Sequence, residues 1–162
     1  MNDAWCTPRW LTDLIPTVDL DPCSNPNSTV RATRALSLEN GDDGLANPWT
    51  EASVFCNPPY SRGQVIRWVR HGVQLVQANP HSWVLFLVKL DPTTGWWRQA
   101  HLVPCRAYPF RKRIRFAGAP ATADFPSALL LMTQDTKHEL PTKLKRALFG
   151  CLEAYPWAPS SV

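Results

Sequence analysis

The stretch from residue 53 to residue 88 constrains the fold more than any other, because it predicts a strand, a helix and a second strand in succession. The run from Trp83 to Val88 is continuously apolar, as expected for a parallel strand that is buried on both faces. The helix predicted over 64–78 carries apolar residues at helical spacing on one face, and Asn79-Pro80 ends it. With a first strand over 53–56, these elements form a right-handed βαβ unit.

The segment Asn57-Pro58-Pro59-Tyr60 directly follows the first of these strands. It therefore lies at the carboxyl edge of the predicted sheet, where open α/β sheets bind their ligands. The two prolines donate no backbone N–H, and they leave carbonyl oxygens that the sheet does not use. The side-chain oxygen of Asn57 and the carbonyl of Pro58 can accept both N–H bonds of one amino group, and the ring of Tyr60 offers a face for a planar base. The motif predicts a pocket for the amino group of a nucleobase or of a side-chain amide.

This motif resembles the catalytic motif of the S-adenosylmethionine-dependent amino-methyltransferases. The wider pattern is similar to the small phage-type DNA N6-adenine methyltransferases, the Dam-like family, over roughly residues 5 to 132. The matching segments come in the family's order: Thr7-Pro8 with Leu11, Leu20-Asp21-Pro22-Cys23, Asp43-Gly44-Leu45 with Trp49, Asn57-Pro58-Pro59-Tyr60-Ser61, and Arg113-Ile114-Arg115-Phe116. The resemblance implies S-adenosylmethionine as cofactor, DNA as substrate, and a catalytic site made of Asn57, Pro58, Pro59 and Tyr60.

Composition is compatible with this resemblance without requiring it. The chain has 162 residues, which suits one domain, and 17 Lys and Arg against 13 Asp and Glu give a net charge of +4, which suits a polyanionic partner. Its five cysteines form no Cys-x-x-Cys pair, and no histidine stands at ligand spacing from them, so we expect neither a metal site nor a disulfide framework. No apolar run approaches the length needed to cross a bilayer. We expect a cytoplasmic protein, in a bacterial host if the phage-type resemblance holds.

Near the N-terminus, Thr7 and Pro8 begin a short helix predicted over Pro8 to Leu14, with Thr7 as its N-cap. The next element is a strand over 17–20, which Asp21-Pro22-Cys23 follows. The resemblance implies that Thr7 and Pro8 border the methionine end of the cofactor, and that Asp21, Pro22 and Cys23 contact it. Asp21 can bind the cationic α-amino group, although Asp before Pro is also common in plain turns. Residues 23–25 replace the glycines usual in this loop.

Residues 26–52 contain few apolar runs, so no strand is predicted there and no acidic residue stands out as the ligand of the cofactor ribose. The segment 40–44 is a strong turn signal. Asp43, in the Asp-Gly-Leu unit that matches the family, is the candidate for binding the adenosine end of the cofactor. The alternative is that Asp42 and Asp43 form a solvated turn. Trp49 is predicted to pack in the core.

In the C-terminal half, residues 110–116 are all basic or apolar, and a strand's period of two puts Arg111, Arg113 and Arg115 on one face and Phe110, Ile114 and Phe116 on the other. Such a row is either a solvated surface or a set of phosphate contacts to DNA. The pair Trp96-Trp97 is expected to pack in the core rather than to touch DNA. A last core strand is predicted over Ser127 to Met132, a covering helix over Leu140 to Tyr155, and a loose tail over 158–162.

These observations together predict an α/β protein with a minimal Rossmann-like methyltransferase fold: a largely parallel sheet with helices on both faces, in a single domain over 1–157. The predicted activity is methyl transfer from S-adenosylmethionine to the N6 amino group of a flipped adenine in DNA, without a metal. Two alternatives remain: the same chemistry on an adenine in RNA or on a glutamine amide in a protein, and a noncatalytic DNA-binding domain with this fold.

Overall fold

A computed structural model describes residues 5–150 and 152–153, and its centre is a seven-stranded sheet with the strand order β2-β1-β3-β4-β6-β5-β7. The strands are β1 (Val18–Asp21), β2 (Ala32–Ala35), β3 (Ser53–Cys56), β4 (Trp83–Lys89), β5 (Cys105–Pro109), β6 (Ser127–Thr133) and β7 (Leu152–Glu153). The helices are α1 (Arg9–Thr12), α2 (Val65–Ala78), α3 (Gly95–Ala100) and α4 (Thr142–Lys145), with a 3-10 turn η1 (Leu38–Asn40).

The sheet is largely parallel, as predicted. Strands β2, β1, β3 and β4 pair in parallel. Strand β6 is antiparallel to both β4 and β5, so β5 runs in the same direction as β4. Strand β7 is antiparallel to β5 at the edge. The carboxyl ends of β1, β2, β3, β4 and β5 therefore all meet at one edge of the sheet.

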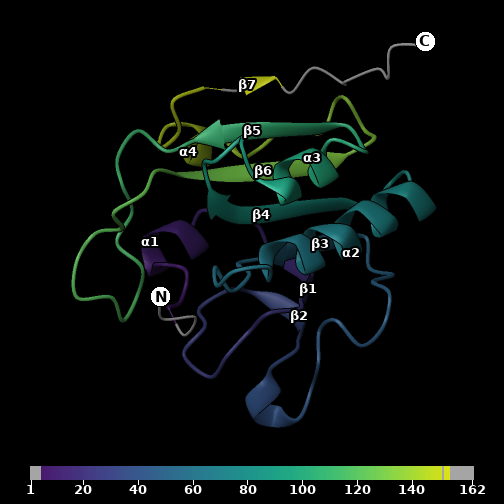
Figure 1. Ribbon diagram of the computed structural model, residues 1–162, viewed down its shortest axis with the longest axis horizontal. Coiled ribbons are helices and arrows are strands. Elements are labelled where there is room, and N and C mark those ends of the chain that lie inside the picture. Colours follow the sequence, from purple (N-terminus) through teal and green to yellow (C-terminus); the bar gives the residue numbers. More distant parts are fainter. Residues whose placement is uncertain (1–4, 151, 154–162) are drawn as a thin grey trace.

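Helices cover both faces of this sheet, which confirms the predicted Rossmann-like layering (Figure 1). Helices α2 and α3 lie on the near face in Figure 1, where Val69, Val73 and Trp96 pack on the sheet. Helices α1 and α4 pack with the loop 110–126 against the opposite face. Two buried apolar layers thus hold the strands in place, and the strand ends remain free to form a site.

The predicted βαβ unit is present as β3-α2-β4. The buried residues of α2 recur at helical spacing, and Asn79 is its C-cap. At Gly72 the helix approaches β4 closely, since a Cβ placed there would lie 2.8 Å from the ring of Phe86. A larger residue would push α2 away from the sheet. This tight contact fixes the point at which the chain passes from β3 into α2, and with it the position of the Asn57 motif.

Two predictions for other elements are wrong, and one strand was missed. Residues 110–116 form no strand; after an isolated bridge at Phe110 the chain runs as a loop. The helix predicted over Leu140 to Tyr155 ends in α4 at Lys145: the N–H groups of Ala147 and Leu148 close a turn, and that of Phe149 bonds to the carbonyl of Pro109 at the end of β5. Strand β2 was not predicted at all, since three of its four residues are exposed.

Smaller differences concern the ends of elements. The N-terminal helix spans only Arg9–Thr12, and Pro8 rather than Thr7 is its N-cap. Strand β1 extends to Asp21, so this carboxylate is the last residue of the strand. The strand predicted over Ser127 to Met132 is confirmed as β6. The domain end at 157 and the tail predicted over 158–162 lie outside the described residues.

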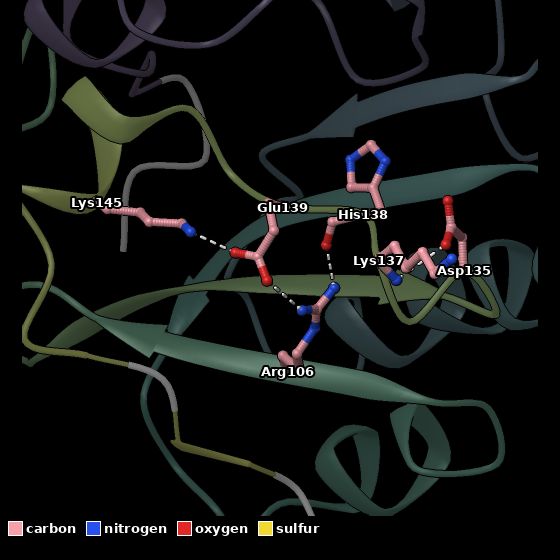
Figure 2. A network of polar contacts seen from close by, with 6 residues as sticks. All are labelled: Arg106, Asp135, Lys137, His138, Glu139 and Lys145. Atoms are coloured by element: carbon pink, nitrogen blue, oxygen red, sulfur yellow. Dashed lines mark hydrogen bonds and ion pairs between the residues drawn. The ribbon is translucent and has the colours of Figure 1, made fainter.

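A polar network secures the antiparallel part of the sheet (Figure 2). Arg106 in β5 donates to the backbone carbonyl of His138, and its guanidinium lies 3.4 Å from a carboxylate oxygen of Glu139. The ammonium of Lys145 in α4 binds the other carboxylate oxygen of Glu139. The ring of His138 packs on Trp83 in β4, with 4.9 Å between the ring centroids. These contacts anchor the segment 135–145 across the sheet, away from the carboxyl edge.

Candidate active site

A cleft with a volume of about 690 Å³ opens at the carboxyl edge of the sheet, beside the ends of β1, β2 and β3. This volume is sufficient for a nucleoside-sized ligand. Several of the residues predicted from sequence line it together: Thr7, Asp21, Pro22, Cys23, Asp43, Asn57 and Pro59. Pro8 does not line the cleft; it is buried at the start of α1.

The floor of the cleft depends on a close approach between two loops. Gly44 lies against the backbone that follows β1, so that a Cβ on it would be 1.9 Å from the carbonyl oxygen of Pro22. The indole of Trp49 donates to the carbonyl of Gly44 over 2.8 Å and packs in the core, as predicted. The Asp43-Gly44-Leu45 unit therefore needs its glycine in order to bring the two loops together.

Asp21 is a buried acid at this edge, with 3% of its surface exposed. One carboxylate oxygen accepts from the backbone N–H of Cys23 over 3.2 Å, and the other lies 3.5 Å from the hydroxyl of Ser28. Burial raises the pKa of Asp21 from 3.8 to about 6, although hydrogen bonds from Cys23, Ser24 and Ser28 oppose the rise. A buried carboxylate that lines a cleft, with no cation bonded to it among the described residues, is suited to bind a cationic group.

The Asn57 side chain is oriented by contacts at both ends of its amide. Its Nδ2 donates to the carbonyl of Trp5 over 3.4 Å, and its Oδ1 accepts from the hydroxyl of Tyr60 over 3.1 Å. The same hydroxyl lies 2.8 Å from the carbonyl oxygen of Leu87 in β4. Since a phenol has one proton, it serves one of these two acceptors at a time.

The ring of Tyr60 packs edge-on against Phe116 and Phe125, with centroid distances of 5.8 and 5.7 Å. Burial raises the pKa of Tyr60 well above its ordinary value, with the nearby Cys56 thiol as the next cause, so the hydroxyl remains a donor. The sequence indicated a role for this ring but none for its hydroxyl. Only the folded chain brings Tyr60 against both Asn57 and the end of β4.

A second pocket, with a volume of about 500 Å³, lies on the other side of the motif. It is lined by residues that follow β3 and β4 and by the first turns of α2 and α3: Tyr60, Ser61, Arg62, Gly63, Val65, Ile66, Lys89, Asp91, Thr94, Gly95 and Trp96. Ser61 lines both this pocket and the larger cleft. The Asn57 motif therefore stands between two adjoining cavities.

The far end of the larger cleft carries acidic residues from two segments. The Asp43 carboxylate accepts from the backbone N–H of Leu45 over 2.9 Å, as in a turn, and the residue also lines the cleft. Leu38 and Glu39 in η1, just after β2, line the same end. Sequence reasoning missed these two, because β2 is an exposed edge strand; the apolar residues Leu36 and Leu38 were the available signal.

The three arginines predicted to contact DNA are exposed on the loop after β5, while Ile114 and Phe116, on either side of Arg115, are buried. The guanidinium of Arg111 lies 5.8 Å from the ring centroid of Phe149, and Arg115 donates to the carbonyl of Ala119 over 3.2 Å. The alternation of exposed and buried side chains holds only from Arg113 to Phe116, and it belongs to a loop anchored by two buried side chains, not to a strand. Trp96 is buried against Trp97 and lines the second pocket.

Within the described residues, no group of three or more His, Cys, Asp and Glu side chains is placed to hold a metal ion. None of the helices in this part of the chain is long and apolar enough to span a membrane.

Comparison with protein families gives one match: the family model described as DNA N-6-adenine-methyltransferase (Dam) covers residues 1–142. The chain belongs to this family. Searches of the curated proteins and of the solved structures find no match. Membership in the DNA N-6-adenine-methyltransferase family confirms the resemblance seen in the sequence. It makes the chain a DNA adenine methyltransferase, whose reaction requires a methyl donor and DNA. Both cavities and the Asn57 motif lie within the matched residues.

Proposed function

We propose that the chain transfers a methyl group from S-adenosylmethionine to the N6 amino group of adenine at a specific DNA site, with the cofactor in the larger cleft and the base in the second pocket. The observation that carries this proposal is the position of the motif between the two cavities. Asn57 lines the cleft, and its hydrogen-bond partner Tyr60 lines the pocket. A group bound to Asn57 Oδ1 would be within reach of both.

The residues at the two ends of the larger cleft suit the two ends of S-adenosylmethionine. At one end, the buried carboxylate of Asp21 complements a cationic α-amino group, with Thr7 beside it on the cleft wall. At the other end, Asp43 and Glu39 offer acceptors for the ribose hydroxyls, and the 80% exposed Leu38 offers an apolar contact for the adenine. The cofactor carries its methyl group on a sulfonium, which is an activated leaving group.

The chain's own residues would hold and activate the amino group of the target. Because an amide oxygen has two lone pairs, Asn57 Oδ1 can accept one N–H bond of the amino group while it still accepts from the Tyr60 hydroxyl. The carbonyl of Pro58 would accept the second. Two acceptors favour a tetrahedral nitrogen, and they stabilise the positive charge that develops on it during methyl transfer. This role needs an amide that does not rotate, which the contacts to Trp5 and Tyr60 provide.

An adenine within a duplex cannot present N6 to a group held in this cleft, so the base must leave the stack. The second pocket is large enough for one base, and its wall includes the rings of Tyr60 and Trp96. The acceptor oxygen of Asn57 recognises an amino group and does not by itself distinguish adenine from other groups that carry one. The family match favours adenine in DNA over RNA adenine or a glutamine amide.

The test is incubation of the protein with labelled S-adenosylmethionine and DNA, followed by mass spectrometry of the hydrolysed nucleosides. We expect N6-methyladenine, and we expect Asn57→Ala to lower turnover at least about 100-fold, as for removal of one preorganised transition-state partner, with cofactor affinity nearly unchanged. RNA and protein substrates run in parallel distinguish the alternative acceptors. Cofactor binding with no methylation of any substrate would instead indicate a noncatalytic domain.

A further inference from the structure

Lys89 is a half-buried cation at the carboxyl end of β4, next to the motif. Its ammonium lies 4.3 Å from the ring centroid of Phe125 and 6.0 Å from that of Tyr60. The residue lines the second pocket together with Tyr60 and Ser61. Lys89 therefore occupies the wall of the cavity in which we place the target base.

Within the described residues, the Lys89 ammonium makes no hydrogen bond and no ion pair, and it lies over two aromatic rings. Hydrogen bonds from the hydroxyl and the backbone N–H of Thr93 to one carboxylate oxygen lower the pKa of Asp91, and the charge of Lys89 helps to lower it, but the side chains of Lys89 and Asp91 form no ion pair. Cation–π contacts satisfy an ammonium only partly, because its three N–H donors remain unused. A partly desolvated cation with open donors at a pocket wall indicates an anionic or strongly accepting ligand.

We propose that Lys89 binds a backbone phosphate of the target nucleotide and thereby positions the flipped adenine against Asn57. The inference rests on the proposed function, because it takes DNA as the ligand of the second pocket. A phosphate fits the site for two reasons. It offers oxygen acceptors to all the open donors of the ammonium, and Arg62 on the same pocket wall adds a second cation. Lys89 is a positioning residue here and takes no part in the methyl transfer.

The contact has a consequence for the Tyr60 ring. In the free protein the ammonium lies over the rings of Tyr60 and Phe125. Movement of the ammonium to a phosphate exchanges two cation–π contacts for charge-assisted hydrogen bonds, and it opens the approach to Tyr60 on the side of the pocket. Arrival of the nucleotide and access to the ring are thus coupled through one flexible side chain.

The experiment compares Lys89→Gln with Lys89→Arg and with the control Lys137→Gln. Lys137 is exposed after β6, across the sheet from the pocket, and its removal changes the net charge by the same amount. Equilibrium binding of a short duplex is measured over a range of salt concentrations. For Lys89→Gln we expect affinity to fall on the order of tenfold near about 0.1 M salt, and the slope of log K against log salt to lose about 0.9 in magnitude. Lys89→Arg should retain most of the affinity and most of the slope.

An unchanged slope in Lys89→Gln, or an equal loss in Lys137→Gln, overturns the proposal, provided that the thermal unfolding of the variants matches that of the wild type. The binding measurement needs no turnover, so its result does not depend on the proposed function. Absence of methylation by the wild type would refute that function, whereas the salt dependence of Lys89→Gln would still show whether Lys89 contacts a phosphate. A second experiment becomes possible when the methylated adenine has been located: its neighbouring phosphate is replaced by a neutral methylphosphonate. This replacement should weaken DNA binding by the wild type but should not weaken binding by Lys89→Gln any further. If the losses from the methylphosphonate and from Lys89→Gln were additive, the proposal would also be overturned.

Discussion

At the scale of the residue, the Tyr60 hydroxyl is the feature that sequence reasoning did not assign. If only the ring of Tyr60 had a role, Tyr60→Phe would have a mild effect on turnover. The hydrogen bond to Asn57 Oδ1 predicts otherwise, because without it the Asn57 amide loses one of its two contacts. We expect Tyr60→Phe to lower kcat by about 10- to 100-fold, as for a misplaced catalytic group, with little change in cofactor affinity. Single-turnover methylation measures the rate, and calorimetry measures cofactor affinity. Turnover of Tyr60→Phe at the wild-type rate would show that the ring alone suffices.

Asp21 offers a test in which stability and binding change in opposite directions. Its pKa is raised from 3.8 to about 6, so the folded chain retains a proton that the unfolded chain has lost. The free energy of unfolding should therefore fall as the pH rises from about 4 to about 6, by roughly 3 kcal/mol at most for Asp21 alone. Asp21→Asn should remove this fall, and hence be more stable than the wild type at neutral pH.

The same substitution should weaken the binding of S-adenosylmethionine, because the proposed partner of its ammonium group is lost. Denaturant unfolding at several pH values and calorimetry with the cofactor measure the two effects separately. A purely structural turn residue would leave cofactor affinity unchanged, so that result would refute the assigned role. A gain in stability together with a loss of affinity is the expected signature of a binding group held in a buried site.

At the scale of the element, the close approach of the Gly44 loop to the backbone after β1 decides the shape of the larger cleft. A Cβ at Gly44 would lie 1.9 Å from the Pro22 carbonyl, so Gly44→Ala must separate the two loops. We expect a loss of about 1–3 kcal/mol of stability, the usual cost of overpacking, and weaker cofactor binding. Gly95→Ala is the matched control for stability, because its nearest contact would be an ordinary 3.8 Å. Equal melting temperatures for the two variants would contradict the packing argument.

The sequence predicted the elements whose own side chains determine their structure. Strand β4 is buried along its length and α2 has one apolar face, so their patterns are unambiguous. Strand β2 lacked such a pattern, because three of its four residues are exposed and its pairing with β1 is set by the rest of the sheet. Without β2, Leu38 and Glu39 could not be placed at the cleft.

The incorrect helix has a comparable cause. Leu140, Leu144 and Leu148 recur every four residues, as in a helix, and all three are buried. The chain satisfies this spacing with the short α4 and a turn, and the backbone N–H of Phe149 then bonds to Pro109. Gly150, with a φ of 130°, directs the chain away from a helix and toward β7. Such long-range pairing leaves no periodic signal in the sequence.

At the scale of the whole molecule, the charge distribution predicts how the protein approaches DNA. The net charge of +4 is modest, so a local group of cations matters more than the total. Arg111, Arg113 and Arg115 are exposed on the loop that follows β5, and β5 ends at the same edge of the sheet as the Asn57 motif. A duplex bound over the two cavities would place its phosphates within reach of this loop.

If these arginines contact phosphates, each substitution by Ala should weaken binding to all DNA sequences alike, because phosphate contacts position a duplex without reading it. Each should also reduce the slope of log K against log salt by about 0.9 in magnitude, through one fewer released counterion. Lys137→Ala serves as the control for a change in net charge. Unchanged slopes in all three variants would make the loop an ordinary solvated surface. Methylation of DNA targets that differ by a single base tests whether one of the arginines instead reads a guanine edge. Substitution of that arginine would relax the preference at one base position by about 1–3 kcal/mol, while substitution of the other two would not.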